Sequence, residues 1–214
     1  VLAPMFIAMS FLYGLAIFIL VLMFAYAQDD RPIGPAMMNR LKNLLGIFIG
    51  AVLLFIVVYF LTKLYGAKNY DLVAFYLVDG GRYTVAFWFG WLLLGLLAPL
   101  GIVFHPALGQ DRNWIAGAST LVVLGGLASM YVIIIGGQAY PMQLFPDKII
   151  LESGFYDGVG GQIAAYAPSI PEFLLGMGGV AVALIITAVG VRVLQFLPES
   201  LADKDVDPHA AAQA

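Results

Sequence analysis

Few residues of this sequence could carry protons, and most of them lie at the ends of apolar stretches. Asp79 and Arg82 stand at the start of one such stretch, separated by two glycines. Residues three apart share one face of a helix, so these two side chains could form an ion pair. If the stretch crosses a membrane, an ionisable residue there is costly unless it is paired or faces water. The pair is therefore either structural or part of a proton path.

Glu172 and His105 each have two interpretations. Ser169-Ile170-Pro171-Glu172 fits the S-x-x-E capping box, in which the Ser and Glu side chains satisfy free N–H groups of a helix. The same position would also suit a carboxylate at the mouth of a proton path. His105 precedes Pro106 and is either a residue that ends a helix, near the negative end of its dipole, or a proton carrier or quinone ligand.

The sequence contains few residues that could bind a metal ion or a haem. It has two histidines, His105 at a predicted helix end and His209 in the tail, and it has no cysteine. A b-type haem held wholly by this chain would need two facing imidazoles, which these positions exclude. Without cysteine there is no disulfide and no thiolate-ligated iron–sulfur cluster. We expect no metal centre in this chain.

The stretch from Gly136 to Glu172 is the one long segment that is neither uniformly apolar nor a short polar turn. Connections of this length are usually functional. Aromatic residues are enriched at protein interfaces, and tyrosines also anchor proteins at membrane surfaces. The candidates for docking a partner protein are Gln138, Tyr140, Phe145, Phe155 and Tyr156.

Composition supplies the setting for these residues. Hydrophobic residues make up 62% of the 214 residues, charged residues 11%, and the mean hydropathy is +0.95. Soluble domains carry about 25% charged residues, so this is a membrane protein. The net charge of −3 argues against nucleic acid as a partner.

A helix needs about 20 apolar residues to cross the hydrocarbon core of a bilayer. The sequence predicts an all-α integral membrane protein with five transmembrane helices and a flexible tail at 198–214. Small residues on the last two spans indicate close helix packing. The predicted helices are 4–27, 37–64, 82–105, 114–136 and 170–196, with a long loop at 137–169.

Five crossings put the two termini on opposite sides of the membrane. We call side A the side of Val1, the 65–78 connection and the 137–169 loop, and side B the side of the other two connections and the tail. Cytoplasmic loops carry an excess of Lys and Arg. Side B has six basic residues against four on side A, which predicts a multi-pass inner-membrane protein with a cytoplasmic C-terminus and a periplasmic long loop. The six are Arg31, Arg40, Lys42, Arg112, Arg192 and Lys204, and the four are Lys63, Lys68, Arg82 and Lys148.

Several blocks of sequence resemble the membrane subunits of the polysulfide reductase family, also called NrfD/PsrC-like, and within it the DsrP group of DsrMKJOP complexes. The most specific blocks are YVIIIGGQAYPMQLFP at 131–146, FYDG at 155–158 and YAPSIPEFL at 166–174. Further blocks are APMF at 3–6, NRLKNLLG at 39–46, HPALGQ at 105–110 and FLPESL at 196–201. The resemblance covers essentially the whole chain.

The resemblance implies a subunit of a respiratory sulfur-metabolism complex that exchanges electrons between quinone, menaquinone or ubiquinone, and a periplasmic ferredoxin-like iron–sulfur subunit. Other partners would include cytochromes. Such subunits have about ten helices, so this chain resembles the last five, the second helix bundle. The quinone pocket of the better-understood relatives belongs to the first bundle, so we expect quinone to bind mainly outside this segment.

Two other classes remain open. One is a proton-conducting or transporter-type subunit, against which the near absence of charges inside the spans argues. The other is a redox-inactive membrane anchor whose long loop docks soluble subunits.

Overall fold

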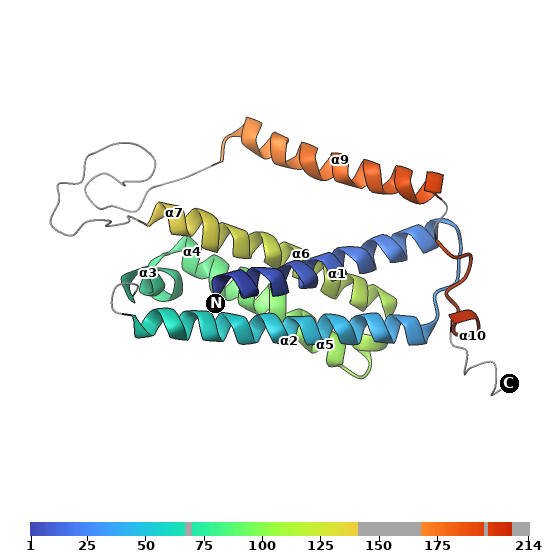
Figure 1. Ribbon diagram of the computed structural model, residues 1–214, viewed down its shortest axis with the longest axis horizontal. Helices are drawn as coiled ribbons and strands as arrows, with labels where there is room; N and C mark the ends of the chain where they lie inside the picture. The colour runs from blue at the N-terminus through green and yellow to red at the C-terminus, as the bar shows by residue number, and fades with distance from the viewer. Residues whose placement is uncertain (67–69, 141–167, 195–196, 207–214) are drawn as a thin grey trace.

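The computed structural model describes residues 1–66, 70–140, 168–194 and 197–206. It contains five helices long and apolar enough to cross a membrane, and the described residues form no β-strand. The prediction of an all-α membrane protein with five spanning helices is confirmed. Figure 1 shows the helices running roughly side by side, with α3, α4 and α7 at the side-A end and α10 at the side-B end.

The first two spans are α1, Leu2–Gln28, and α2, Pro35–Tyr65. Pro35 occupies the first turn of α2, where its fixed φ and missing N–H fit a helix start. The residues that α1 buries recur every three or four positions, as one face of an α-helix requires. They are Met5, Met9, Leu12, Ala16, Ile19, Leu22 and Tyr26.

The third span changes its winding along its length. It consists of α4, Arg82–Val85, the π-helix η3, Ala86–Leu97, and α5, Ala98–Phe104. A π-helix closes i→i+5 hydrogen bonds, so its turns hold more residues than the 3.6 of an α-helix. The buried residues of α4 and η3 recur every four or five positions, at Tyr83, Phe87, Trp91, Gly95 and Leu96.

The fourth span contains α6, Arg112–Met130, the π-helix η5, Tyr131–Gly136, and α7, Gly137–Ala139. The sequence predicted the long loop to begin at residue 137, but the helical structure continues for three more residues, to Ala139. The side chain of Asp111 caps α6 by accepting a hydrogen bond of 2.8 Å from the N–H of Asn113.

Glycines allow spans three and four to touch. A Cβ atom placed on Gly95 would lie 2.5 Å from the Cα of Gly125, and one on Gly125 would lie 2.2 Å from the Cα of Gly95. Backbones that approach this closely are the usual use of small residues in membrane helices. The expected packing role of the small residues is therefore seen on span four.

The connection at 65–78, expected to be a loop, is helical over its described part. It holds α3, Tyr70–Ala74, and the π-helix η2, Phe75–Asp79. The loop interpretation is wrong because the run from Leu72 to Val78 is almost entirely apolar and buries Val73, Phe75 and Tyr76 against the bundle.

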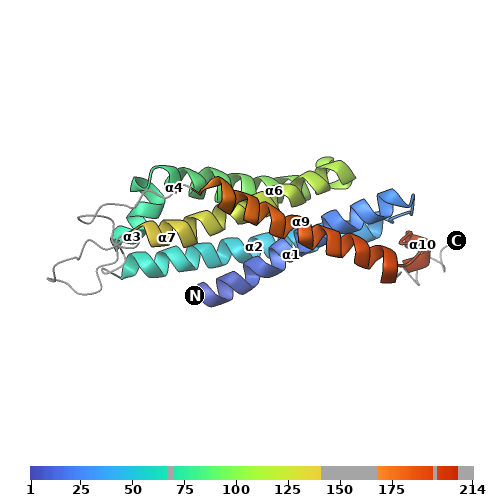
Figure 2. The same cartoon turned by 90° about the horizontal axis from the view of Figure 1, so that it is seen from above.

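The last span, α9, Ile170–Leu194, stands apart from the other helices in Figure 1 and crosses over α6 and α1 in the view from above in Figure 2. It buries none of its described side chains. The chain then returns to the side-B end, where residues 197–206 lie against the turn between α1 and α2 and end in the short helix α10, Asp203–Val206. The flexible tail predicted from residue 198 thus makes defined contacts over its described part.

Candidate functional site

Asp79 and Arg82 do not form the expected ion pair; both are exposed, and no described residue of opposite charge pairs with either. The prediction assumed one continuous helix. Gly80 and Gly81 instead interrupt it, and Gly81 adopts a φ of 53°, which favours glycine. The guanidinium of Arg82 lies 5.1 Å from the centre of the Tyr83 ring, and its Nη2 lies 3.5 Å from the Tyr83 hydroxyl.

His105 and Glu172 both make local capping contacts. Nδ1 of His105 accepts hydrogen bonds of 3.2 Å from the N–H groups of Ala107 and Leu108, which fixes the start of the 3₁₀ turn Leu108–Gln110 at side B. Oε2 of Glu172 accepts a 2.9 Å hydrogen bond from the N–H of Ser169, the reciprocal half of a capping box. His105 lies at the opposite end of the third span from Arg82, so these residues do not form one local site.

Of the partner-docking candidates, Gln138 is exposed on α7 and Tyr140 is half-buried just beyond it. The Tyr140 ring packs 5.3 Å from that of Phe75. Phe145, Phe155 and Tyr156 lie outside the described residues.

Tyr140 belongs to a larger group, which we call the side-A aromatic cluster. Its rings come from α2, η2, α4, η3, η5 and the end of α7, and each contacts another member with centroids no more than 6.4 Å apart. The members are Tyr59, Phe60, Phe75, Tyr76, Tyr83, Phe87, Trp88, Trp91, Tyr131 and Tyr140.

Ring geometry in this cluster is favourable. Phe60 and Phe87 meet edge to face at 5.0 Å, and Tyr83 stacks on Tyr131 at 5.1 Å with 21° between the planes. Such pairs contribute about 0.5–1.5 kcal/mol each beyond the burial of their area. A Cβ on Gly137 would lie 2.9 Å from the Tyr76 hydroxyl oxygen, so this glycine gives the ring its room.

Two tyrosines of the cluster lie outside the spanning helices and are held neutral. Burial, and then the nearby Tyr59, raises the pKa of Tyr76 above its usual value. Burial, and then the carboxylate of Asp71, raises the pKa of Tyr140. Tyr76 makes no side-chain hydrogen bond to any described residue, so its hydroxyl remains a neutral donor. The inner rings of the cluster, among them Phe75 and Tyr76, are buried against one another, and Trp88 and Tyr140 form part of its outer edge. Exposed or partly exposed aromatic side chains of this kind suit contact with a partner protein.

Tyr13, Ser129 and the cluster member Trp91 bring polar atoms into the middle of the bundle. Ser129 donates its proton to the carbonyl of Gly126 over 2.7 Å, so the Tyr13 hydroxyl, 3.1 Å from Ser129 Oγ, must donate to it. This series of hydrogen bonds ends on the backbone carbonyl of Gly126, which cannot pass a proton onward. The buried indole N–H of Trp91 lies beside the Tyr13 hydroxyl and makes no hydrogen bond of ideal geometry with a described residue.

Sequence reasoning singled out only Tyr140 from this cluster. A signal was present: eleven of the 33 residues from Tyr59 to Trp91 are aromatic, against 14% of the whole chain. What the sequence did not reveal was that the face of the third span with Tyr83, Phe87 and Trp91 turns toward the bundle, because the run is apolar on every side.

The fold and this site define a multi-pass, all-α membrane protein with an aromatic end and few buried charges. Residues 1–142 match the family described as "Polysulphide reductase, NrfD", and the chain belongs to that family. It is 30% identical over 209 residues to the "Hdr-like menaquinol oxidoreductase integral membrane subunit" of Archaeoglobus fulgidus. That alignment covers 95% of this chain and 51% of the relative, so the chain spans about half the relative's length. No solved structure matches the chain.

Proposed function

We propose that this chain is the membrane-embedded part of a quinol-interacting subunit in an oxidoreductase complex. The observation that carries this proposal is the 30% identity, over 95% of the chain, to a menaquinol oxidoreductase membrane subunit. Membership of the polysulphide reductase family agrees with it. The name of this relative indicates menaquinone as the quinone, and ubiquinone has the same pair of carbonyl groups.

The chain would position quinone within electron-transfer reach of a cluster held by a partner subunit. We propose that a partner subunit holds the electron acceptor; the described residues of this chain include no group of three or more potential metal ligands. We place the main quinone pocket outside this segment, with the side-A aromatic cluster as one wall of the complex at that end.

The finer proposals follow the resemblance to DsrP-like subunits. In them the complex serves respiratory sulfur metabolism, side A is periplasmic, and Gln138 and Tyr140 help to dock an iron–sulfur subunit, with Phe145, Phe155 and Tyr156. Gln138 is exposed at the side-A end of span four, which supports this docking role. Side B, with its six basic residues, would face the cytoplasm.

The test is to purify the complex from its natural host and measure quinol-dependent electron transfer together with subunit content. We expect quinol oxidation by the intact complex and its loss when this chain is deleted. Phe155→Ala with Tyr156→Ala, or Gln138→Ala, should release the iron–sulfur subunit. Gln110→Ala is the matched control, because Gln110 is equally exposed but precedes the same span at side B. If the intact complex contains all its subunits but does not oxidise quinol, this chain is a redox-inactive membrane anchor instead.

A proton-conducting role predicts a different result. The middles of the described spans hold no Asp, Glu, Lys or Arg, which disfavours such a path. The purified chain in liposomes with a pH-sensitive dye should therefore show no proton flux beyond that of empty liposomes. Flux without a redox partner would favour the transporter class.

A further inference from the structure

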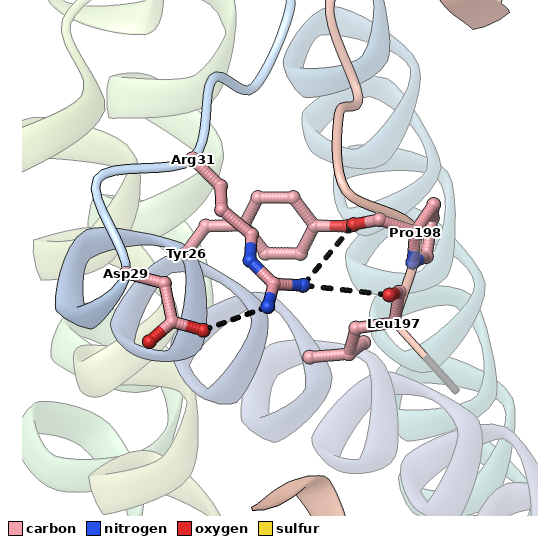
Figure 3. A network of polar contacts seen from close by, with 5 residues as sticks. All are labelled: Tyr26, Asp29, Arg31, Leu197 and Pro198. Carbon is pink, nitrogen blue, oxygen red and sulfur yellow. Dashed lines mark hydrogen bonds and ion pairs between the residues drawn. The ribbon is translucent and has the colours of Figure 1, made fainter. Parts of the chain in front are cut away.

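The segment Leu197–Val206, which we call the clasp, lies on the turn between α1 and α2. Figure 3 shows its first part: the Tyr26 hydroxyl donates a 2.8 Å hydrogen bond to the carbonyl of Pro198. Nη1 of Arg31 lies 3.4 Å from the carbonyl oxygens of both Leu197 and Pro198, while its Nη2 pairs with Asp29 at 3.0 Å. Two side chains at this turn, those of Tyr26 and Arg31, thus bind the backbone at the start of the clasp.

Backbone hydrogen bonds continue the contact. The N–H of Leu201 donates to the carbonyl of Pro32 over 3.0 Å, and the N–H of Gly34 donates to the carbonyl of Leu201 over 2.7 Å. Ile33 and Leu201 form the resulting parallel bridge, and Ile33 is buried there. This pairing fixes the register of the clasp on the turn.

The register brings Asp203 to the first turn of α2. Helix starts leave backbone N–H groups without partners, and a carboxylate is the favoured acceptor. The N-cap residue of α2 is Gly34, which has no side chain to supply one. Oδ1 and Oδ2 of Asp203 accept from the N–H of Ala36 at 3.1 and 3.3 Å, so the cap comes from a residue 167 positions away.

Gly34 admits this carboxylate. A Cβ atom at Gly34 would lie 2.0 Å from Oδ1 of Asp203. The φ of Gly34 is −70°, which any residue can adopt, so the requirement for glycine comes from the carboxylate and not from backbone strain.

These contacts matter because α9 buries none of its described side chains and stands apart from the bundle (Figure 1). We propose that the clasp is the docking device that fastens α9 to the bundle, and that Asp203, seated against Gly34, is its closing contact. The family match ends at residue 142, so the clasp joins a part of the chain outside that match to a turn inside it. The inference is independent of the proposed function.

The first test is limited trypsin cleavage after Lys204, measured by mass spectrometry on the purified chain in lipid nanodiscs. Asp203→Ala should speed cleavage at least about tenfold, whereas Asp203→Asn should stay close to wild type, because Asn is an equally good capping acceptor. Gly34→Ala should reproduce the effect of Asp203→Ala, and the double variant should be no faster than either single one. Glu199→Ala is the control, since this acidic residue is exposed and makes no hydrogen bond or ion pair with a described residue.

The second test follows α9 itself. The chain has no cysteine, so spin labels at Ile17→Cys in α1 and Val182→Cys in α9 report one distance. We expect a single narrow distance distribution that becomes broad in the Asp203→Ala background. Wild-type cleavage rates in Asp203→Ala and Gly34→Ala, or a distribution that stays narrow in Asp203→Ala, would overturn the proposal.

Discussion

The hydroxyl groups of Tyr13 and Ser129 lie 3.1 Å apart and join α1 to α6 in the middle of the bundle. Polar contacts between membrane helices contribute about 0.6 kcal/mol on average and up to about 1.7 kcal/mol. We therefore expect Tyr13→Phe and Ser129→Ala each to lower the free energy of unfolding by about 1 kcal/mol in detergent. The double variant should show a coupling energy of about the same size.

The control is Tyr65→Phe, because Tyr65 is 96% exposed at the end of α2. It should leave the free energy of unfolding unchanged. Additive losses in the Tyr13 and Ser129 variants would mean that the two hydroxyls act independently.

The crossing of Gly95 and Gly125 predicts a steric effect. Alanine at either position would place a methyl group within 2.5 Å of the facing backbone, and overpacking of this kind costs about 1–3 kcal/mol. Gly101→Ala on the same span as Gly95, and Gly117→Ala on α6, have open space and should be neutral or slightly stabilising. Thermal unfolding of the four variants measures the difference, and equal melting temperatures would contradict the packing described.

The raised pKa of Tyr76 predicts a loss of stability at alkaline pH. The unfolded chain titrates this phenol near its usual value of 10.0, while the folded protein holds it protonated to higher pH. The unfolded state therefore binds fewer protons above pH 10, and the free energy of unfolding falls as the pH rises beyond that point. Tyr76→Phe should reduce this decline between pH 9 and about 11.5, measured by denaturant unfolding.

Glu172 allows a cap to be separated from a proton carrier. Glu172→Gln keeps an acceptor for the N–H of Ser169, so it should change the stability little, whereas Glu172→Ala should cost about 1 kcal/mol. An amide cannot relay a proton. Slower quinol turnover in Glu172→Gln, with subunit content unchanged, would show a proton role, and unchanged turnover would leave only the cap.

Topology can be tested at the two ends of the fourth span. Gln138 and Gln110 are both exposed and lie at the two ends of the fourth span, which we expect to be on sides A and B of the membrane. A membrane-impermeant maleimide added to intact cells should label Gln138→Cys and spare Gln110→Cys until the membrane is permeabilised. The reverse pattern would place side A in the cytoplasm.

The number and type of the spanning helices could be predicted because long apolar runs leave few alternatives in a bilayer. The cap made by Glu172 was also accessible, since the capping box is a local pattern. The pairing of Asp79 with Arg82 was not, because it depended on whether Gly80-Gly81 continue the helix. Spacing alone cannot show a positive φ at Gly81.

The aromatic cluster and the clasp are both long-range features. Phe60 of α2 meets Phe87 of η3 only after the two helices pack. The π-helical winding of η3 could not be predicted from a sequence that is apolar on every side. Asp203 caps α2 from 167 positions away, in a tail whose acidic composition suggested no contact. Both lie beyond the reach of local patterns.

Two basic residues at the side-B end, Lys42 and Arg112, bond to backbone carbonyl groups. Lys42 donates to the carbonyl of Gly109 and Arg112 to that of Ile33, as Arg31 does to those of the clasp. A carbonyl satisfies the donor without cancelling its charge. Lys42 and Arg112 thus join the loops at side B, and Lys and Arg residues near the ends of spans also bias the orientation of a new chain in the membrane. Replacing them with neutral donors could keep the loops joined and yet turn the protein over in the membrane.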